Sequence, residues 1–313
     1  MEHMRDITFT KLSGSGNDFI CVDARDGTYD DLLGDAARAS TFARVLCRRH
    51  VGVGADGLIF ALPSEVGDLA DLSVRFYEPD GSQAELCGNG TACFTHWAIE
   101  QGMVAGAQVR SLTSAGTVIG KRIDDVYVRV CIPLPESLRR GLEVMADDQL
   151  FDCDFAVTGV PHLVVYVDDV ARVDVERLGR VLRWHEHFQP RGANVNFVQV
   201  IRPGEIALRT FEFGVEGETL SCGTGSATAA ICAGLRFGWD RALLRGQQPT
   251  LVRARSGDVL RVWATIEDDG RVSELCLDTI VRVLFRGTVH PDLAAKALGQ
   301  APAPAERATP NET

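Results

Sequence analysis

A short motif rich in cysteine and glycine occurs twice in this chain, and its repetition limits the folds open to the sequence. Residues 86–92 read LCGNGTA and residues 220–228 read LSCGTGSAT. In both copies a cysteine stands where an extended segment gives way to a helix-forming run. A cysteine at a helix N-terminus meets the positive end of the helix dipole and free N–H groups, which favour its thiolate. The sequence therefore predicts two activated thiols, Cys87 and Cys222, and paired acid–base chemistry.

The repeat extends upstream of both cysteines. Arg75 and Glu78 precede Cys87 with the same internal spacing that separates Arg209 from Glu212 ahead of the second motif. The period of about 135 residues is too long for a solenoid repeat. The sequence therefore predicts two similar domains that face one another, each contributing one cysteine to a shared cleft.

Proline residues and a change of composition mark the predicted domain boundaries. Pro133 and Pro135 end the first unit, so the first domain comprises residues 1–133 and a returning strand at about 279–290. The second domain comprises residues 134–278. From 291 to 313 the chain turns rich in Ala, Pro and Glu, and this composition predicts a disordered tail.

The hydrophobic pattern predicts alternating runs of helices and short strands. Helices are expected at 29–50, 89–102, 175–182 and 225–237, and strands at 7–9, 19–22, 58–62, 72–77, 109–113, 117–123, 126–132, 163–167, 195–201, 206–211, 251–254, 259–266, 272–277 and 281–285. The glycine-rich turn 13–18 resembles a dinucleotide-binding fingerprint. Phe19 replaces its third glycine and no helix follows, so a Rossmann fold is excluded.

Composition excludes several classes of partner. The net charge of −11 and the absence of a Lys/Arg block argue against nucleic acid. The sequence contains no run of about 18 apolar residues, so no membrane span is expected. The first residues have no signal-peptide core, so we expect a cytoplasmic protein.

The nine cysteines do not have the spacing of a disulfide framework or a zinc site. Most of them, including Cys21, Cys131 and Cys232, stand in apolar runs and are expected to be buried core thiols. His185 and His187 do not share a helix face, so no metal is expected there.

Two thiols on opposite sides of a carbon atom suit one reaction in particular. Inversion at the α-carbon of an amino acid needs a base on one face and an acid on the other, and a thiolate and a thiol supply both. The two helix N-termini would direct N–H groups at the α-carboxylate, and glycines let the backbone approach it closely. A redox pair or a purely structural motif are the alternatives for the two cysteines.

Together, several segments resemble the diaminopimelate epimerase family over about residues 7–288. They are Ser13–Phe19, Gly52–Leu58, Asp80–Ser82, Cys87–Gly90, Pro161–His162, Asn194–Val198, Gly217–Thr219 and Cys222–Gly225. The resemblance implies an α+β fold with two pseudo-symmetric domains, each a mainly antiparallel sheet or barrel wrapped round a central helix. It implies no pyridoxal phosphate, no other cofactor and no metal. It also implies that Cys87 and Cys222 are the catalytic bases, and that the substrate-binding residues are Asn17, Gly88, Asn89, His162, Asn194, Glu212, Gly223 and Thr224.

The departures from the family pattern concentrate on the distal end of the substrate. Glu78 and Val160 replace asparagines that the family usually has, Phe213 replaces an arginine that pairs with the distal carboxylate, and Ala92 replaces another arginine. Replacing arginine by phenylalanine removes a bidentate carboxylate partner, and Glu78 would repel a second carboxylate.

We therefore expect an amino-acid racemase or epimerase whose substrate has no distal carboxylate and a cationic or aromatic side chain, such as histidine, lysine, ornithine or diaminobutyrate. Diaminopimelate itself is the alternative, in which case Glu78 only hydrogen-bonds the substrate amino group or a loop. A non-catalytic amino-acid-binding protein is a second alternative. The expected partner is a small amino acid; a homodimer is compatible with the sequence but is not predicted by it.

Overall fold

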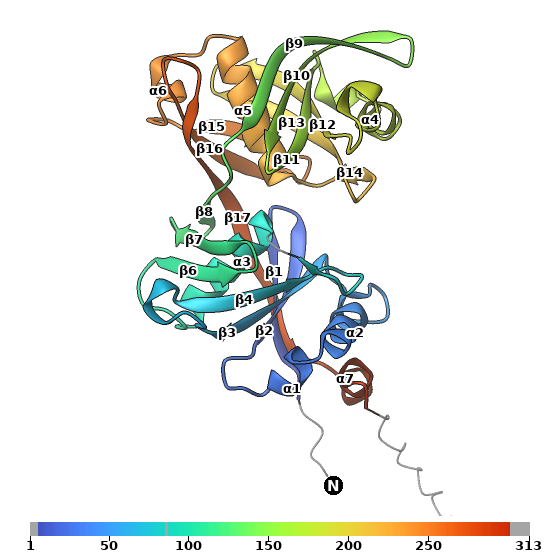
Figure 1. Cartoon of the computed structure of the whole chain (residues 1–313), viewed down its shortest axis with the longest axis vertical. Coiled ribbons are helices and arrows are strands. Elements are labelled where there is room, and N and C mark those ends of the chain that lie inside the picture. The colour runs from blue at the N-terminus through green and yellow to red at the C-terminus, as the bar shows by residue number, and fades with distance from the viewer. Residues whose placement is uncertain (1–5, 85–86, 301–313) are drawn as a thin grey trace, which may run out of the picture.

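A computed structural model describes residues 6–84 and 87–300. The chain forms two halves stacked one above the other (Figure 1). Each half is a set of strands around one central helix, which is α3 (Gly88–Glu100) in the first half and α5 (Gly223–Arg236) in the second. Most residues of these two helices are buried, because strands contact them on several sides. The predicted α+β fold class is confirmed.

The two halves share one strand topology, which is the structural form of the sequence repeat. In the first half, neighbours from β1 to β8 pair antiparallel, except that β2 runs parallel to β3 and β4 runs parallel to β6. From β10 to β17 the order is the same, with the parallel pairs β11–β12 and β13–β15. The first set is β1 (Thr8–Gly14), β2 (Asn17–Asp23), β3 (Gly57–Pro63), β4 (Leu72–Tyr77), β5 (Gln83–Ala84), β6 (Gln108–Thr113), β7 (Gly116–Arg122) and β8 (Tyr127–Cys131). The second set is β10 (Gln149–Thr158), β11 (Val160–Tyr166), β12 (Asn194–Arg202), β13 (Glu205–Glu212), β14 (Gly217–Thr219), β15 (Thr250–Arg253), β16 (Val259–Ile266) and β17 (Val272–Thr288).

The long strand β17 connects the halves. Its first part pairs with β16 in the second half, and its last part, from Val281, pairs with β1 in the first half. Between them it pairs with β8, and there Cys131 lies directly opposite Cys276 and forms a disulfide with it. The expectation that Cys131 is a buried core thiol is therefore wrong. Sequence alone could not show this pairing, since the two cysteines lie 145 residues apart and only the strand register brings them together.

A hairpin of β9 (Glu136–Ala146) and β10 follows the first half, and no strand was predicted at the position of β9. The first part of β9 is mostly exposed and polar, and the apolar alternation that marks a strand is limited to Leu142, Val144 and Ala146 near its end. The predicted helix 29–50 is two helices, α1 (Asp30–Leu33) and α2 (Ala36–Cys47). Asp35 separates them, because its side chain accepts the first N–H groups of α2 and caps a new helix.

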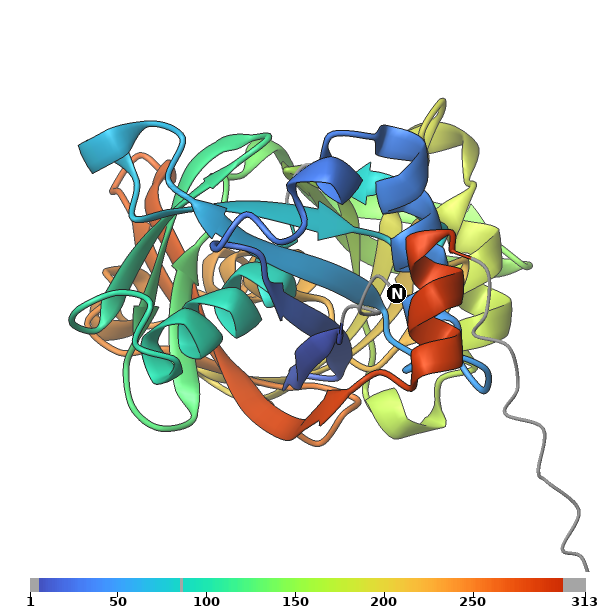
Figure 2. The ribbon, with the colours of Figure 1, turned by 90° about the horizontal axis from the view of Figure 1, so that it is seen from below.

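The predicted disordered tail is wrong for its first residues. Residues Pro291–Leu298 form helix α7, which packs against α2 (Figure 2). Ala294, Ala297 and Leu298 are buried in the core of the first half, which supplies the driving force that composition alone does not reveal. Residues 301–313 of that predicted tail lie outside the described residues.

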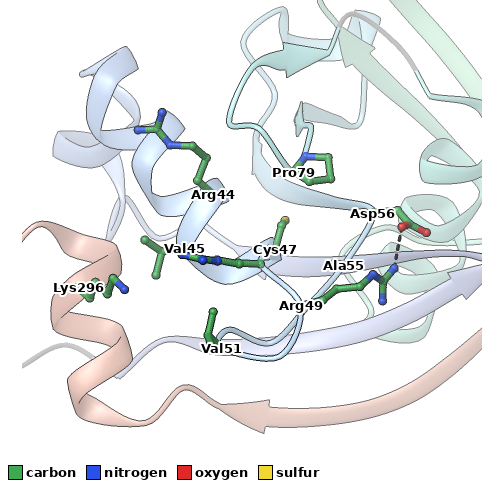
Figure 3. A pocket seen from close by; sticks show the side chains of 10 residues that line it. Arg44, Val45, Cys47, Arg49, Val51, Ala55, Asp56, Pro79 and Lys296 are labelled. Carbon is green, nitrogen blue, oxygen red and sulfur yellow. Dashed lines mark hydrogen bonds and ion pairs between the residues drawn. The ribbon is translucent and has the colours of Figure 1, made fainter. Parts of the chain in front are cut away.

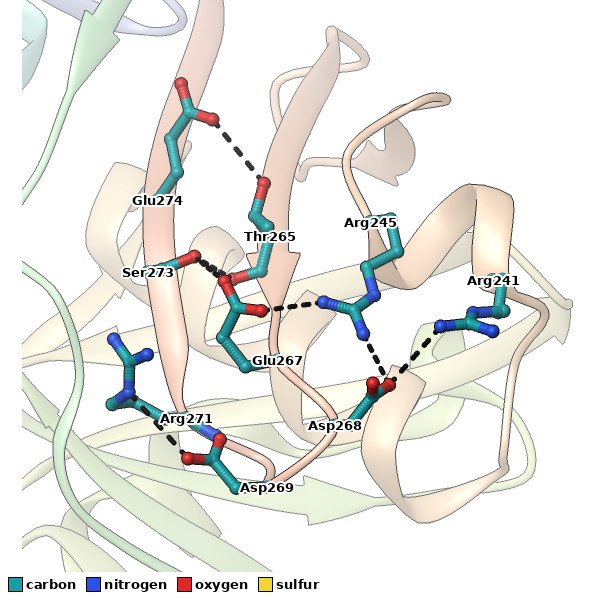
Figure 4. Close-up of polar contacts among 9 residues, drawn as sticks. All are labelled: Arg241, Arg245, Thr265, Glu267, Asp268, Asp269, Arg271, Ser273 and Glu274. Atoms are coloured by element: carbon teal, nitrogen blue, oxygen red, sulfur yellow. Dashed lines mark hydrogen bonds and ion pairs between the residues drawn. The ribbon is translucent and has the colours of Figure 1, made fainter.

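The remaining helices lie on the second half and on its surface. They are α4 (Val175–Arg183) and α6 (Arg241–Leu244), with short 3-10 turns at Val170–Arg172 and Glu186–Phe188; a further 3-10 turn, Gly67–Leu69, lies between β3 and β4 of the first half. Arg245, just after α6, pairs with Glu267 at 2.7 Å and with Asp268, and so ties α6 to the turn between β16 and β17 (Figure 4). In the part of the chain that the structure describes, no helix is long and apolar enough to cross a membrane.

Candidate active site

Cys87 and Cys222 are the N-cap residues of the two central helices, and both line one cleft. Their backbones are extended, with φ of −133° and −122°, so each strand-to-helix turn brings the thiol to the helix N-terminus. The cleft has a volume of about 980 Å³ and takes residues from both halves. The helix ends are close, since a Cβ added to Gly223 would lie 3.8 Å from Asn89 Oδ1. The repeat thus brings one free thiol from each half to a shared cavity.

The pKa values of both thiols are raised, contrary to the expectation of thiolates favoured at rest. Burial raises the pKa of Cys87 to about 11, and the carboxylates of Glu78 and Glu212 add to the shift. Burial raises the pKa of Cys222 to about 12, with Glu212 contributing again. Loss of water outweighs the helix dipole here, because both sulfurs lie in a cavity that acidic residues also line. Both cysteines are therefore thiols in the free protein at neutral pH.

The Cys87 half of the cleft is held by amide groups. Gly90 N donates to Cys87 Sγ at 3.4 Å. The preceding residue, Asn89, donates from Nδ2 to Asn17 Oδ1 at 2.6 Å. This hydrogen bond joins the first turn of α3 to the start of β2. Gly90 also has to be small, since an added Cβ would lie 3.0 Å from the Phe76 ring. These contacts fix the first turn of α3 beside the thiol.

The Cys222 half is held by a chain of buried polar side chains. Asn196 Nδ2 donates to His162 Nδ1 at 3.2 Å, and His162 Nε2 contacts Thr224 Oγ1 at 3.0 Å. An amide nitrogen only donates, so His162 Nδ1 accepts, Nε2 carries the proton, and Thr224 Oγ1 receives it. The Thr224 hydroxyl proton is then free to point at Cys222 Sγ, 3.7 Å away.

The orientation of the Asn196 amide is fixed from its other side. Its Nδ2 also donates to the carbonyl of Leu163 at 3.0 Å, and its Oδ1 accepts from Thr210 Oγ1 at 3.0 Å. His162 is fully buried, and burial lowers its pKa to about 3, so the ring is neutral. The chain therefore has one direction of donation, from Thr210 through Asn196, His162 and Thr224 to the sulfur.

The outer part of the cleft combines carboxylates with apolar side chains. The pKa of Glu78 is raised by burial of its carboxyl and by Asp80 and Asp56, and that of Glu212 is raised by burial and by Asp56 and Glu78. Glu78 makes no side-chain hydrogen bond or ion pair with any described residue. The cleft therefore holds a carboxyl group, that of Glu78, with which no described side chain pairs.

Phe213 lines the same cleft from the second half, and the buried Arg183 stacks on its ring. The guanidinium carbon of Arg183 lies 4.1 Å from the Phe213 ring centre and 4.2 Å from that of Trp184. Arg183 also pairs with Glu216 at 3.3 Å and donates to the carbonyl of Arg191 at 2.7 Å. Its charge is thus used inside the protein, behind the cleft.

Most of the predicted site residues line the cleft. They are Asn17, Glu78, Cys87, Gly88, Asn89, Val160, Glu212, Phe213, Cys222, Gly223 and Thr224. His162 and Asn194 instead lie behind the lining. Asn194 Oδ1 accepts from the Phe213 N–H at 2.8 Å, and its Nδ2 donates to the carbonyl of Pro161 at 3.1 Å.

Sequence reasoning missed Asn196, Thr210 and Arg183. Asn196 could have been found, since it follows Asn194 by two residues and therefore points to the same face of β12. Among the described residues no group of three or more His, Cys, Asp or Glu side chains could hold a metal ion. His185, one of the two histidines considered above, contacts the carbonyl of Met145 at 3.1 Å on the surface.

Comparison with known proteins agrees with this architecture. A sequence model described as diaminopimelate epimerase matches residues 9–127 and 155–273. A protein named diaminopimelate epimerase from Aquifex aeolicus (strain VF5) is 40% identical over 287 residues, covering 91% of this chain and 98% of that protein. One from Gemmatimonas aurantiaca (strain DSM 14586 / JCM 11422 / NBRC 100505 / T-27) is 37% identical over 289 residues, covering 90% and 99%.

Solved structures share the fold at low sequence identity. A PhzF-family phenazine biosynthesis protein of Bacillus anthracis matches with a TM-score of 0.66 at 16% identity, covering 92% of this chain and 100% of that one. A probable proline racemase of Agrobacterium radiobacter K84 matches with a TM-score of 0.62 at 18% identity, covering 91% and 93%. The sequence matches carry the assignment: the chain belongs to the diaminopimelate epimerase family and is an enzyme of the isomerase class.

Proposed function

We propose that this protein is a cofactor-independent amino-acid racemase or epimerase in which Cys87 and Cys222 act as the two bases. The observation that carries the proposal is the position of two free thiols at two helix N-termini on one cleft. Two opposed groups that exchange a thiolate for a thiol can invert a carbon centre, because one removes the proton and the other returns one to the opposite face.

The proton balance needs one thiolate and one thiol. A thiolate on one side takes the α-proton and becomes a thiol, while the thiol on the other side gives its proton to the opposite face and becomes the thiolate. The reverse reaction starts from that swapped state. With pKa values of about 11 and 12, the productive form is a small fraction of the free enzyme at neutral pH. The Thr224 hydroxyl supports the thiolate form of Cys222, since it can donate to the sulfur.

The α-carboxylate of the substrate is expected between the two helix N-termini. The first-turn N–H groups after each N-cap have no partner within the helix, so they can donate to an anion. These groups belong to Gly88 and Asn89 on one side and Gly223 and Thr224 on the other, all of which line the cleft. The same donors would stabilise the charge that develops as the α-proton leaves.

The distal end of the cleft favours a cationic side chain over a second carboxylate. The carboxyl of Glu78 has no protein partner, and its pKa is raised by its surroundings, so a cation beside it would lower its cost of ionisation. Phe213 stands where the family has a carboxylate-binding arginine, and Arg183 behind it is already paired with Glu216. We propose histidine, lysine, ornithine or diaminobutyrate as substrates, and diaminopimelate, the substrate in the names of the relatives, as the competing candidate.

Deuterium exchange at the α-carbon tests both parts of this proposal. The protein is incubated in deuterated water with single amino acids, diaminopimelate included, and exchange is followed by proton NMR while inversion is followed by chiral chromatography. We expect exchange and inversion with a cationic monocarboxylate, both lost in Cys87→Ala and in Cys222→Ala. Faster exchange with diaminopimelate than with every monocarboxylate would overturn the substrate class. No exchange with any amino acid would overturn the enzymatic role and leave a binding protein.

A further inference from the structure

A second hollow lies beside the cleft, at the C-terminal end of α2. It has a volume of about 610 Å³, which is in the range that holds small molecules. Arg44, Arg48 and Arg49 line it from α2 and the following loop, and Lys296 lines it from α7. In Figure 3, Lys296 lies on one side of the hollow and Arg49, bound to Asp56, on the other. Four cations therefore surround a cavity in which Asp56 is the one acidic lining residue.

Most of this positive charge is not used within the protein. Arg49 pairs with Asp18 at 2.9 Å and with Asp56 at 2.7 Å. Within residues 6–84 and 87–300, Arg48 and Lys296 make no side-chain hydrogen bond or ion pair, and Arg44 hydrogen-bonds only Thr41 Oγ1, at 3.1 Å, while its charge lowers the pKa of the Asp80 carboxyl without an ion-pair contact. Acidic partners are abundant in a chain of net charge −11, so three cations without an ion pair in one cavity need a reason.

Stabilisation of the helix end does not supply that reason. Cations are favoured at a helix C-terminus because its last carbonyls have no partner within the helix. Here backbone N–H groups of the following loop bind the last two carbonyls of α2: Gly54 donates to Leu46 at 2.9 Å and Ala55 donates to Cys47 at 3.0 Å. Gly52 N donates to the next carbonyl, that of Arg48, at 2.9 Å. The glycine-rich loop thus closes the helix without help from the arginine side chains.

We propose that this hollow binds a small phosphate-bearing anion. Guanidinium groups match phosphate oxygens in pairs, and an ammonium group on the opposite wall adds a further donor. Val45, Val51, Ala55 and Pro79 form apolar parts of the wall, which could contact an organic group attached to the phosphate. The site is separate from the amino-acid chemistry proposed above, although Arg49, Asp56 and Pro79 line both cavities.

Calorimetric titration with pyrophosphate at an ionic strength of about 0.1 M, where the Debye length is about 10 Å, tests the site. We expect one pyrophosphate per chain and a Kd that rises about tenfold or more in the double variant Arg48→Gln/Lys296→Gln. The matched control is Arg172→Gln/Lys121→Gln, which removes the same charge from two cations without ion pairs on other elements. The control should change the Kd by less than about twofold, because the two charges that it removes do not line the hollow and salt screens their effect on the electrostatic potential there.

Several outcomes separate the proposal from general attraction of anions. Equal weakening in both double variants, or no saturable binding to the unaltered protein, would overturn it. Arg44→Gln gives an independent single change with the same expected direction. The α-carbon exchange rate, which should stay unchanged in all of these variants, shows that they are folded.

ATP binding more tightly than pyrophosphate would assign an organic phosphate, and equal affinities would assign an inorganic one. Succinate binding as tightly as either would overturn the preference for phosphate.

Discussion

The two halves of the molecule have the same strand topology but support their cysteines differently. The strand pairing places Phe19 opposite Gly57 in the first half and His162 opposite Asn194 in the second. The next pair of strands places Ile59 opposite Phe76 and Asn196 opposite Thr210. The first-half residues at these equivalent positions, beside Cys87, are thus apolar.

Beside Cys222 the equivalent residues form the hydrogen-bonded chain that ends at Thr224. A buried polar chain is favourable only if all its members find partners, whereas an apolar cluster has no such requirement. The difference shows that the repeat conserved the backbone that presents each thiol, while the groups around each thiol diverged. The cleft lining differs between the halves as well, with Phe213 in the second half and the Glu78 carboxyl in the first, and the proposed function assigns the choice of substrate to these two residues.

The largest effect should come from replacing Glu78 and Phe213, one from each half, by the residues that the family usually has at these positions. Glu78→Asn with Phe213→Arg removes the free carboxylate and restores a carboxylate-binding guanidinium. We expect the ratio of kcat/KM for diaminopimelate to that for the best cationic monocarboxylate to rise by about 100-fold or more, since each change acts on a charged contact. The measurement is exchange kinetics with both substrates. An unchanged ratio would mean that the distal pocket lies elsewhere.

Removing the donor at the end of the polar chain should have the next largest effect. Thr224→Val deletes the hydroxyl that can donate to Cys222 Sγ and should lower kcat by about 10- to 100-fold, with a smaller change in KM. Thr224→Ser keeps the hydroxyl and should restore most of kcat. Loss of kcat in both variants would show that the methyl group, and hence packing, is what matters.

His162 tests the same chain at a buried position. His162→Phe copies Phe19 of the other half but leaves one of the two N–H groups of the Asn196 amide without an acceptor, which should lower the free energy of unfolding by about 1–3 kcal/mol. It should also lower kcat toward the Thr224→Val value, because the threonine hydroxyl is no longer oriented. The double variant His162→Phe/Thr224→Val should then be little slower than either single one. Additive losses in kcat would contradict a shared chain.

The two thiols should also differ in reactivity. Thiolate is the reactive form, and the pKa is about 11 for Cys87 and about 12 for Cys222. Because a raised pKa lowers the thiolate fraction at any lower pH, alkylation of both should quicken about tenfold per pH unit between pH 7 and 9. Cys87 should react faster than Cys222, because its pKa is lower and it is less buried, and peptide mapping after timed iodoacetamide treatment would measure this. Preferential labelling of Cys222 would reverse the assigned order.

The sequence predicted those parts of the molecule that the repeat itself encodes. Cys87 and Cys222 could be placed at helix N-termini because the motif couples a turn, glycines and a helix-forming run. The central helices and most strands followed from hydrophobic periodicity. The family resemblance supplied the cleft residues, and eleven of the thirteen predicted ones line it.

What could not be predicted depends on tertiary pairing. The direction of the polar chain at His162 depends on which atoms of Asn196 and Thr224 reach it, and no local pattern encodes that. The raised thiol pKa values follow from burial between two halves, which outweighs the helix-end effect visible in each motif. Helix α7 looked like a tail because its composition is low in large apolar residues, yet its alanines fill a surface offered by the core.

The smallest effect on catalysis should come from the bond that joins the strands connecting the halves. Cys131→Ala/Cys276→Ala removes the disulfide between β8 and β17. Residues on either side of it, among them Val130 and Leu277, line the cleft, yet β8 and β17 remain paired through their backbones. We therefore expect kcat/KM to change by less than about twofold. The free energy of unfolding should fall by up to about 4 kcal/mol, because the crosslink closes a loop of 145 residues in the unfolded chain. Chemical denaturation of the variant and of the unaltered protein, with and without reductant, measures this. A fall in kcat/KM well beyond twofold under conditions where the variant is still folded would mean that the crosslink sets the relative position of the halves. The cleft would then depend on a fixed junction rather than on the two motifs alone.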